Sequence, residues 1–248
     1  MFPKMKFLVA SLTFLSLLPS SAQTKEQSKE KSCRVIYLQR PQDAPTGAYL
    51  FDGAVSHKVE LPGMNFSEVV NLPAGDITLG MTPGPVDAPE NFPKGAPMVK
   101  VPAHVMDLYL IVGSDPTNAV LPIRMLALDV STGKLKPGET IWVNLTGHRI
   151  AAKLGDESLD VPPGGRAVGK APLKASGYYN ARFAYQPRDG KELLPIMSKS
   201  WWHDAKSKHL GFIIESGGRL PRIFVFRDFR DEPIVEPKEG GEVAPVEE

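Results

Sequence analysis

The stretch 198–211, SKSWWHDAKSKHLG, holds the most varied chemistry in the chain: two adjacent tryptophans, two histidines and an aspartate. Tryptophan rings stack on flat ligands. A histidine beside a carboxylate can move a proton or bind a metal ion. The same side chains also occur in ordinary strands, where a tryptophan fills the core. The segment could therefore be a binding patch, an active centre or a structural strand.

The positions of these side chains favour a split cluster. In a β-strand, adjacent side chains point to opposite faces. Trp201 and His203 then share one face, and Trp202 and Asp204 share the other. Trp201 is in phase with Met197, so we expect Trp201 in the core and Trp202 on the more exposed side. A ligand site here would use Trp202, with Asp204 and His203 as polar neighbours, and we expect it to be non-catalytic.

The sequence gives little support for a bound metal ion or cofactor. A metal site needs several histidine, cysteine or carboxylate side chains that converge. The only local group is His203, Asp204 and His209, and the two lysines between them would oppose a cation. No HExxH or CxxC motif occurs. The sequence predicts no metal site and no cofactor.

Hydrolase motifs are also absent from the sequence. There is no GxSxG elbow, and the Ser-Gly pairs in VGSDP and ESGG fit hairpin turns. VPPGGRAVGK ends in Gly-Lys, but no helix pattern follows it, as a phosphate loop requires. A triad can still be assembled from distant residues. A hydrolase of that kind is the alternative to a non-catalytic protein.

The first residues predict export. Lys4 and Lys6 precede an apolar run at 7–19, and Ala22 supplies a small residue before a cut. This is the layout of a secretory signal peptide over 1–22. The apolar run is short for a bilayer span, so no membrane span is expected after signal removal. We expect a periplasmic or extracellular protein.

The rest of the chain divides by composition. The segment 23–32 is polar and predicts a flexible leader, and 232–248 is acidic and predicts a disordered tail. The single cysteine, Cys33, excludes an internal disulfide, and we expect it to be buried at the start of a strand. Between leader and tail we expect two β-sandwich units, over 33–132 and 133–231.

Alternation of apolar and polar residues predicts an all-β, antiparallel sandwich fold. DITLGM, RIAAKLG and YYNARFAYQ all alternate, and turn signals rich in Pro, Gly and Asp separate them. In TIWVNLT, the period places Ile141 and Val143 inward and Trp142 and Asn144 outward. Asn144 also begins an Asn-Leu-Thr sequon, which an outward asparagine would leave open to glycosylation. No amphipathic helix follows the signal.

Two pairs of segments resemble each other in the same order. The segments 72–83 and 161–172 share Pro and Gly at equal offsets. The segments 108–129 and 210–228 share an apolar strand, a turn, Leu-Pro, a second strand and an Asp. These matches fit an internal duplication, or the chance recurrence of turn residues in any β protein.

The opening CRVIYLQRPQDAPTGAYLFDG and NLPAGDITLGMTP resemble secreted bacterial domains of unknown function. The second half, VNLTGHRIAAKLGDESLDVPPGG, is similar to other uncharacterised exported β-sandwich proteins. The shared motifs are turns, and they cover about half of the ordered chain. The resemblance implies an all-β exported protein and brings no catalytic residue with it.

The charge balance narrows the partners. The formal net charge is +1, and no basic stripe interleaves with aromatics, so nucleic acid is not an expected partner. We expect a binding or structural role outside the cytoplasm, with a glycan or another exported protein as partner. The sequence sets no oligomeric state.

Overall fold

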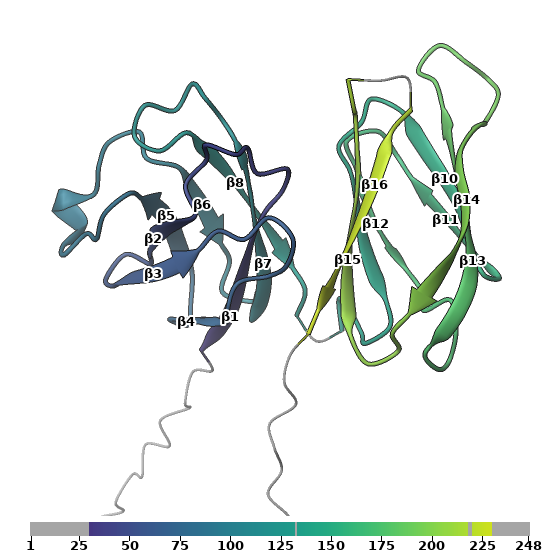
Figure 1. The fold of residues 1–248 in the computed structure, drawn as a ribbon. Helices are drawn as coiled ribbons and strands as arrows, with labels where there is room; N and C mark the ends of the chain where they lie inside the picture. Colours follow the sequence, from purple (N-terminus) through teal and green to yellow (C-terminus); the bar gives the residue numbers. More distant parts are fainter. Residues whose placement is uncertain (1–29, 132, 218–219, 230–248) are drawn as a thin grey trace, which may run out of the picture.

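The computed structural model describes residues 30–131, 133–217 and 220–229. The predicted signal peptide 1–22 and acidic tail 232–248 lie outside these residues, as does most of the leader. Within the described chain the fold is all-β, as predicted, and the one helical element is a short 3₁₀ turn, η1 (Pro89–Asn91). Figure 1 shows two groups of strands side by side.

Each group contains eight strands. The first comprises β1 (Lys31–Tyr37), β2 (Gly47–Phe51), β3 (Ser56–Glu60), β4 (Val70–Leu72), β5 (Ile77–Thr82), β6 (Met98–Val101), β7 (Asp107–Ser114) and β8 (Ile123–Asp129). The second comprises β9 (Thr140–Asn144), β10 (Arg149–Leu154), β11 (Glu157–Val161), β12 (Arg166–Gly169), β13 (Gly177–Gln186), β14 (Leu194–His203), β15 (Lys208–Ile214) and β16 (Arg222–Asp228).

The strand order is the same in both groups. In the first unit, sheet A has the order β4-β1-β7-β8 and sheet B the order β3-β2-β5-β6. In the second, sheet C has the order β12-β9-β15-β16 and sheet D the order β11-β10-β13-β14. Adding eight to each strand number converts one unit into the other. Both units also contain one parallel pair, β1 with β7 and β9 with β15, so sheets A and C are mixed, not antiparallel throughout.

The repeat corrects one of the two sequence matches. The segments 108–129 and 210–228 cover β7–β8 and β15–β16, which are equivalent strands. The match between 72–83 and 161–172 was wrong. It aligns β4 and β5 with β11 and β12, but β11 and β12 are equivalent to β3 and β4 of the first unit. Proline and glycine are selected at any tight turn, so their spacing alone did not identify equivalent strands.

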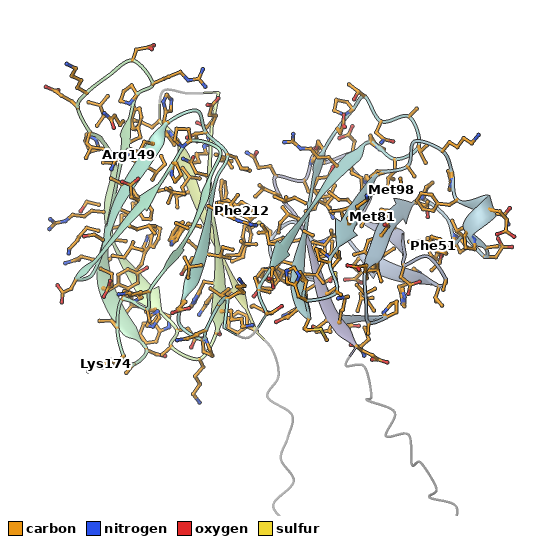
Figure 2. All side chains as sticks on the ribbon, turned by 180° about the vertical axis from the view of Figure 1, so that it is seen from behind. Phe51, Met81, Met98, Arg149, Lys174 and Phe212 are labelled. Carbon is orange, nitrogen blue, oxygen red and sulfur yellow. The ribbon has the colours of Figure 1, made fainter. Side chains whose placement is uncertain are left out.

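The four sheets stack in the order B, A, C, D, with an apolar core in each of the three gaps. One core joins sheets A and B, one joins A and C, and one joins C and D. Tyr109 and Ile111 of β7 meet Phe212 of β15 in the middle gap, and Phe212 lies between the two units in Figure 2. Sheets A and C are therefore covered on both faces, which explains apolar runs such as LYLIV and LGFII.

Burial on both faces corrects the expectation for β9. Trp142 and Asn144 point into the second unit and are buried, not outward. The Asn144 amide donates to the carbonyls of His148, Val161 and Pro162, at 2.7, 3.2 and 2.9 Å. Its side-chain oxygen accepts from the Thr146 backbone and hydroxyl. The sequon is thus a turn that Asn144 ties together, and the asparagine is inaccessible to modification in the folded chain.

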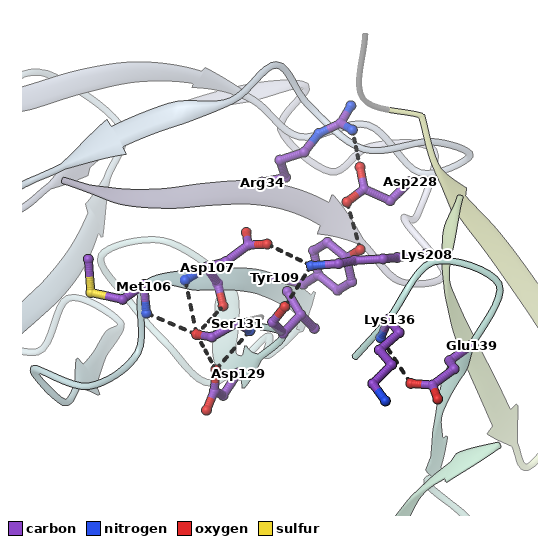
Figure 3. A network of polar contacts seen from close by, with 11 residues as sticks. Arg34, Met106, Asp107, Tyr109, Asp129, Ser131, Lys136, Glu139, Lys208 and Asp228 are labelled. Atoms are coloured by element: carbon purple, nitrogen blue, oxygen red, sulfur yellow. Dashed lines mark hydrogen bonds and ion pairs between the residues drawn. The ribbon is translucent and has the colours of Figure 1, made fainter. Parts of the chain in front are cut away.

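A polar network crosses the interface between the units (Figure 3). Arg34 of β1 forms an ion pair with Asp228 of β16, and the Tyr109 hydroxyl donates to the same carboxylate at 2.7 Å. Lys208 of β15 donates to the Asp107 carboxylate at 3.0 Å and to the Val130 carbonyl at 2.8 Å. Apolar packing and partly buried ion pairs together hold the units in one arrangement.

The end of the predicted leader is part of the fold. Lys31 and Ser32 belong to β1, and the Lys31 side chain is fully buried. Its ammonium donates to the carbonyls of Pro102, Ala103 and Val105, at 3.0, 3.0 and 2.7 Å, and burial lowers its pKa. Three carbonyls match the three N–H donors of an ammonium group, so the buried charge is satisfied.

The burial of Cys33 is confirmed: its thiol lies in the core between sheets A and B, and burial raises its pKa to about 12.

Candidate functional site

The two units open at opposite edges. In the first, β6 contacts β8 and closes that side, whereas a hollow of ≈ 740 Å³ lies between β3 and β4. In the second, β11 contacts β12 across the PPGG turn and closes that side. Sheets C and D are then open between β14 and β16, where the described chain forms a cavity of ≈ 290 Å³. A second, more apolar hollow of ≈ 460 Å³ lies along the same opening.

All three tryptophans of the chain line the smaller cavity of the second unit, which we call the β14–β16 cavity. Trp142 comes from β9 in sheet C, and Trp201 and Trp202 come from β14 in sheet D. The other lining residues are Thr140, Leu154, Lys170, Pro172, Tyr179, His203, His209, Ile223, Val225 and Arg227. Within the described chain, the lining contains aromatic, imidazole and cationic groups and no carboxylate.

Stacked rings form the inner wall. Trp142 and Trp201 lie with ring centroids 6.4 Å apart and planes 15° apart, and Phe183 packs against both at 5.1 and 5.4 Å. Trp142 is buried, and Trp201 is partly buried against the same core. The inward direction predicted for Trp201 from its phase with Met197 is therefore confirmed.

Two glycines make room for Trp142. Gly211 is its partner across the parallel β9–β15 pair, and a Cβ there would lie 2.3 Å from the indole ring. A Cβ at Gly169 on β12 would lie 3.0 Å from the indole nitrogen. Any side chain at Gly211 would overlap the indole ring, so the position of Trp142 in the cavity wall requires this glycine.

Two buried histidines stand beside the rings. His203 ends β14 and His209 lies on β15, and their ring centroids are 6.0 Å apart. Burial lowers the pKa of His203, and burial together with the neighbouring His203 lowers the pKa of His209 to about 4. Both imidazoles are neutral at pH 7 as a result.

The exposed tryptophan belongs to the outer face of sheet D. Trp202 is 50 % exposed and meets Tyr178 of β13 edge to face, with centroids 5.0 Å apart. Its predicted exposure is confirmed, and it borders the mouth of the cavity. A ring in this position is accessible to a ligand.

The predicted set Trp202, His203 and Asp204 is only partly brought together. Trp202 and His203 line the cavity from the rim and the interior. Asp204 does not line it. Its carboxylate accepts from the Lys206 backbone at 3.0 Å and the Ser207 hydroxyl at 2.7 Å, so it closes the turn after β14. A ligand role for Trp202 and His203 stays a prediction.

Sequence reasoning missed the partners that come from other strands. Trp142 was expected outward, and Tyr179 was not linked to a ligand site. Lys170 was noticed only as the end of a Gly-Lys pair in a turn, and Arg227 gave no signal, because their nearness to β14 depends on the sheet order. His209 was noticed only as a neighbour of His203 in sequence.

Two other polar clusters contain groups that could do chemistry: His57 with Asp52, and the charged hollow of the first unit. His57 Nε2 lies 2.9 Å from the Asp52 carboxylate, but Asp52 also caps the β2–β3 turn through the Ala54 and Val55 backbones. The adjacent Ser56 hydroxyl donates to the Val86 carbonyl. The first-unit hollow carries charges of both signs from Arg40, Lys58, Glu60 and Glu68. The cluster of His57 and Asp52 is explained by the β2–β3 turn that it stabilises.

The described residues contain no group of three or more His, Cys, Asp and Glu side chains arranged to hold a metal ion. Nor do they contain a helix with the length and apolarity of a membrane span.

Comparison with known proteins adds no assignment: no protein-family model matches the chain, and no curated protein aligns with it significantly.

Proposed function

We propose that the protein is exported and binds a carbohydrate in the β14–β16 cavity without chemically changing it. The observation that carries this proposal is the gathering of all three tryptophans around one cavity. The C–H faces of a sugar ring are apolar and match the negative face of an indole ring. Trp202 and the partly buried Trp201 offer such faces at the rim and on the inner wall.

The size and setting of the cavity support this function. Its volume of ≈ 290 Å³ is near the lower end of the range of about 300–1,000 Å³ for ligand pockets. That volume suits one sugar ring, with any further units outside. The export of the protein, proposed from its first 22 residues, would place the cavity where extracellular and cell-envelope glycans occur.

The test is a glycan panel screened by intrinsic tryptophan fluorescence. Because every tryptophan lines the cavity, the signal reports on this region alone. We expect a saturable change with at least one carbohydrate, lost in Trp202→Ala and kept in Met98→Ala, which removes an exposed apolar side chain of the first unit. Absence of binding across the panel would reject the proposal. Release of new reducing ends from the bound glycan would favour the hydrolase alternative.

A further inference from the structure

Three polar atoms on the cavity wall have no hydrogen-bond partner among the described residues: Trp142 Nε1, His203 Nε2 and His209 Nδ1. Their side chains belong to residues that are 1, 3 and 4 % exposed. Leaving a buried polar atom unpaired costs about 1–3 kcal/mol. Three such atoms around one cavity point to a ligand that supplies their partners.

The protonation of the two imidazoles specifies what each atom needs. Burial lowers the pKa of both rings, so both are neutral at pH 7. A neutral imidazole has one N–H and one lone pair, so a hydroxyl group can satisfy whichever of the two the unpaired nitrogen carries. The unpaired Trp142 indole N–H needs an acceptor.

The hydrogen-bonding needs of these three nitrogens fit a polyhydroxylated ring. A hydroxyl group both donates and accepts, so neighbouring hydroxyls of one sugar can satisfy all three atoms. A plain aromatic ligand would fill the same space but would leave both imidazole nitrogens unpaired.

The cationic residues at the mouth of the cavity favour a negatively charged ligand. Lys170 and Arg227 line it, and neither forms an ion pair within the described part of the chain. The Arg227 guanidinium lies 4.8 Å above the Phe229 ring, which holds it at the end of β16. A guanidinium recognises a carboxylate through two parallel hydrogen bonds.

We infer that the ligand is an acidic sugar, a hexuronic acid residue whose hydroxyls meet His203, His209 and Trp142 and whose carboxylate meets Arg227 and Lys170. This inference rests on the proposed carbohydrate-binding function and narrows it. The same residue could be a free monosaccharide or the end of a polyuronate chain.

The experiment compares D-glucuronate with D-glucose by isothermal titration calorimetry on the full-length mature protein. The two sugars differ at C6, where one has a carboxylate and the other a hydroxymethyl group. We expect glucuronate to bind at least about tenfold more tightly, as one charge-assisted contact provides. Arg227→Gln should remove this preference. Arg222→Gln, on the same strand but outside the cavity, should keep it.

The same titration with an oligoglucuronide distinguishes a free monosaccharide from the end of a polyuronate chain as the ligand. Tighter binding of the oligomer indicates a chain end as ligand, and equal binding indicates the monosaccharide. Equal affinity for glucose and glucuronate, or an equal loss of both in Arg227→Gln, would overturn the acidic-sugar inference and leave carbohydrate binding in place. Failure of every sugar to bind would reject both.

Discussion

The two units share one strand order and differ in what fills them. Among the residues that the structure describes, the core between sheets A and B contains 17 buried apolar residues, nearly all aliphatic, whereas the core between sheets C and D contains nine and is centred on Trp142. Seven further apolar residues in the second unit are only partly buried, and most of them come from β13, β14 and β16. The same topology therefore encloses a larger, mainly aliphatic core in one half and a smaller core centred on a tryptophan in the other.

The difference lies in which pair of edge strands meets. The nine-residue link between β3 and β4 leaves the first unit open there, while β6 and β8 close its other side. The four-residue PPGG turn draws β11 and β12 together, and the ten-residue β14 continues past β16 without comparable contact. Link length and strand length thus placed the openings on opposite sides, one with charges of both signs and one with aromatic and cationic groups.

The largest expected effect concerns the contact between the units. Asp228→Ala removes the carboxylate that pairs with Arg34 and accepts from the Tyr109 hydroxyl, while the Ser67 and Phe229 carbonyls still accept from the guanidinium. We therefore expect a loss near the lower end of the range of about 3–5 kcal/mol for breaking a buried ion pair. We expect chemical denaturation of the native protein to follow one transition, because the middle core joins both units. Tryptophan fluorescence reports only the second unit, and far-UV circular dichroism reports both. Separate midpoints from the two probes would show that the units unfold independently.

The second prediction concerns the pH dependence of stability, to which a histidine of the second unit contributes and a histidine of the first does not. The pKa of His209 is about 4 in the folded protein and its ordinary value is 6.5. Between these values the unfolded chain binds more protons, so the free energy of unfolding falls as pH falls through this window. The loss is at most about 3 kcal/mol for this group. Denaturation at pH 7 and pH 4.5 measures it.

The matched variants for that prediction are His209→Gln and His104→Gln. His209 is buried in the second unit, and His104 is exposed in a loop of the first. The first substitution should reduce the pH dependence of stability, and the second should leave it unchanged. An unchanged pH dependence in His209→Gln would contradict the assignment.

The third prediction compares glycines on equivalent strands. Gly211→Ala on β15 places a Cβ 2.3 Å from the Trp142 ring, and overpacking of this kind costs about 1–3 kcal/mol. Gly113→Ala on β7 brings a Cβ no closer than 3.4 Å to Arg124 and should change stability little. Thermal unfolding of both variants checks the difference. Equal stability would mean that Trp142 has space to move and that the cavity is not shaped by this contact.

The smallest expected effect on stability distinguishes the adjacent tryptophans. Trp202→Ala removes a half-exposed ring and should change the free energy of unfolding by about 0.5 kcal/mol or less. Trp201→Ala removes a ring that packs on Trp142 and Phe183, and should cost about 3 kcal/mol or more. Urea denaturation of the single variants gives both values. Large and equal losses would show that Trp202 is also a core residue, leaving no accessible ring for a ligand.

The local sequence pattern predicted those structural features that depend on a single strand. The all-β class and the opposite directions of Trp201 and Trp202 follow from the period of two, and the burial of Cys33 follows from the apolar character of a free cysteine. That period failed at Trp142 and Asn144, because it assumes that one face of a strand meets water. Sheet C is covered on both faces, and only the stacking of the two units decides that.

The site needed information that no single segment contains. Arg227, at the end of β16, and Lys170, just after β12, line the same cavity as Trp201. Gly211 had no visible role until its pairing with Trp142 was known. Sheet order and register, both set by long-range packing, bring these residues together, so the adjacent tryptophans alone indicated the region but not the cavity.

The most direct test of the β14–β16 cavity as the ligand site is a titration of ¹⁵N-labelled protein with D-glucuronate, following the three indole N–H resonances. Each tryptophan lines the cavity, and only Trp142 has a buried indole nitrogen without a partner in the described chain. We expect saturable shifts at the indoles, largest at Trp142 as its N–H gains an acceptor. Binding that leaves all three indole signals unmoved, or no binding at all, would contradict this assignment.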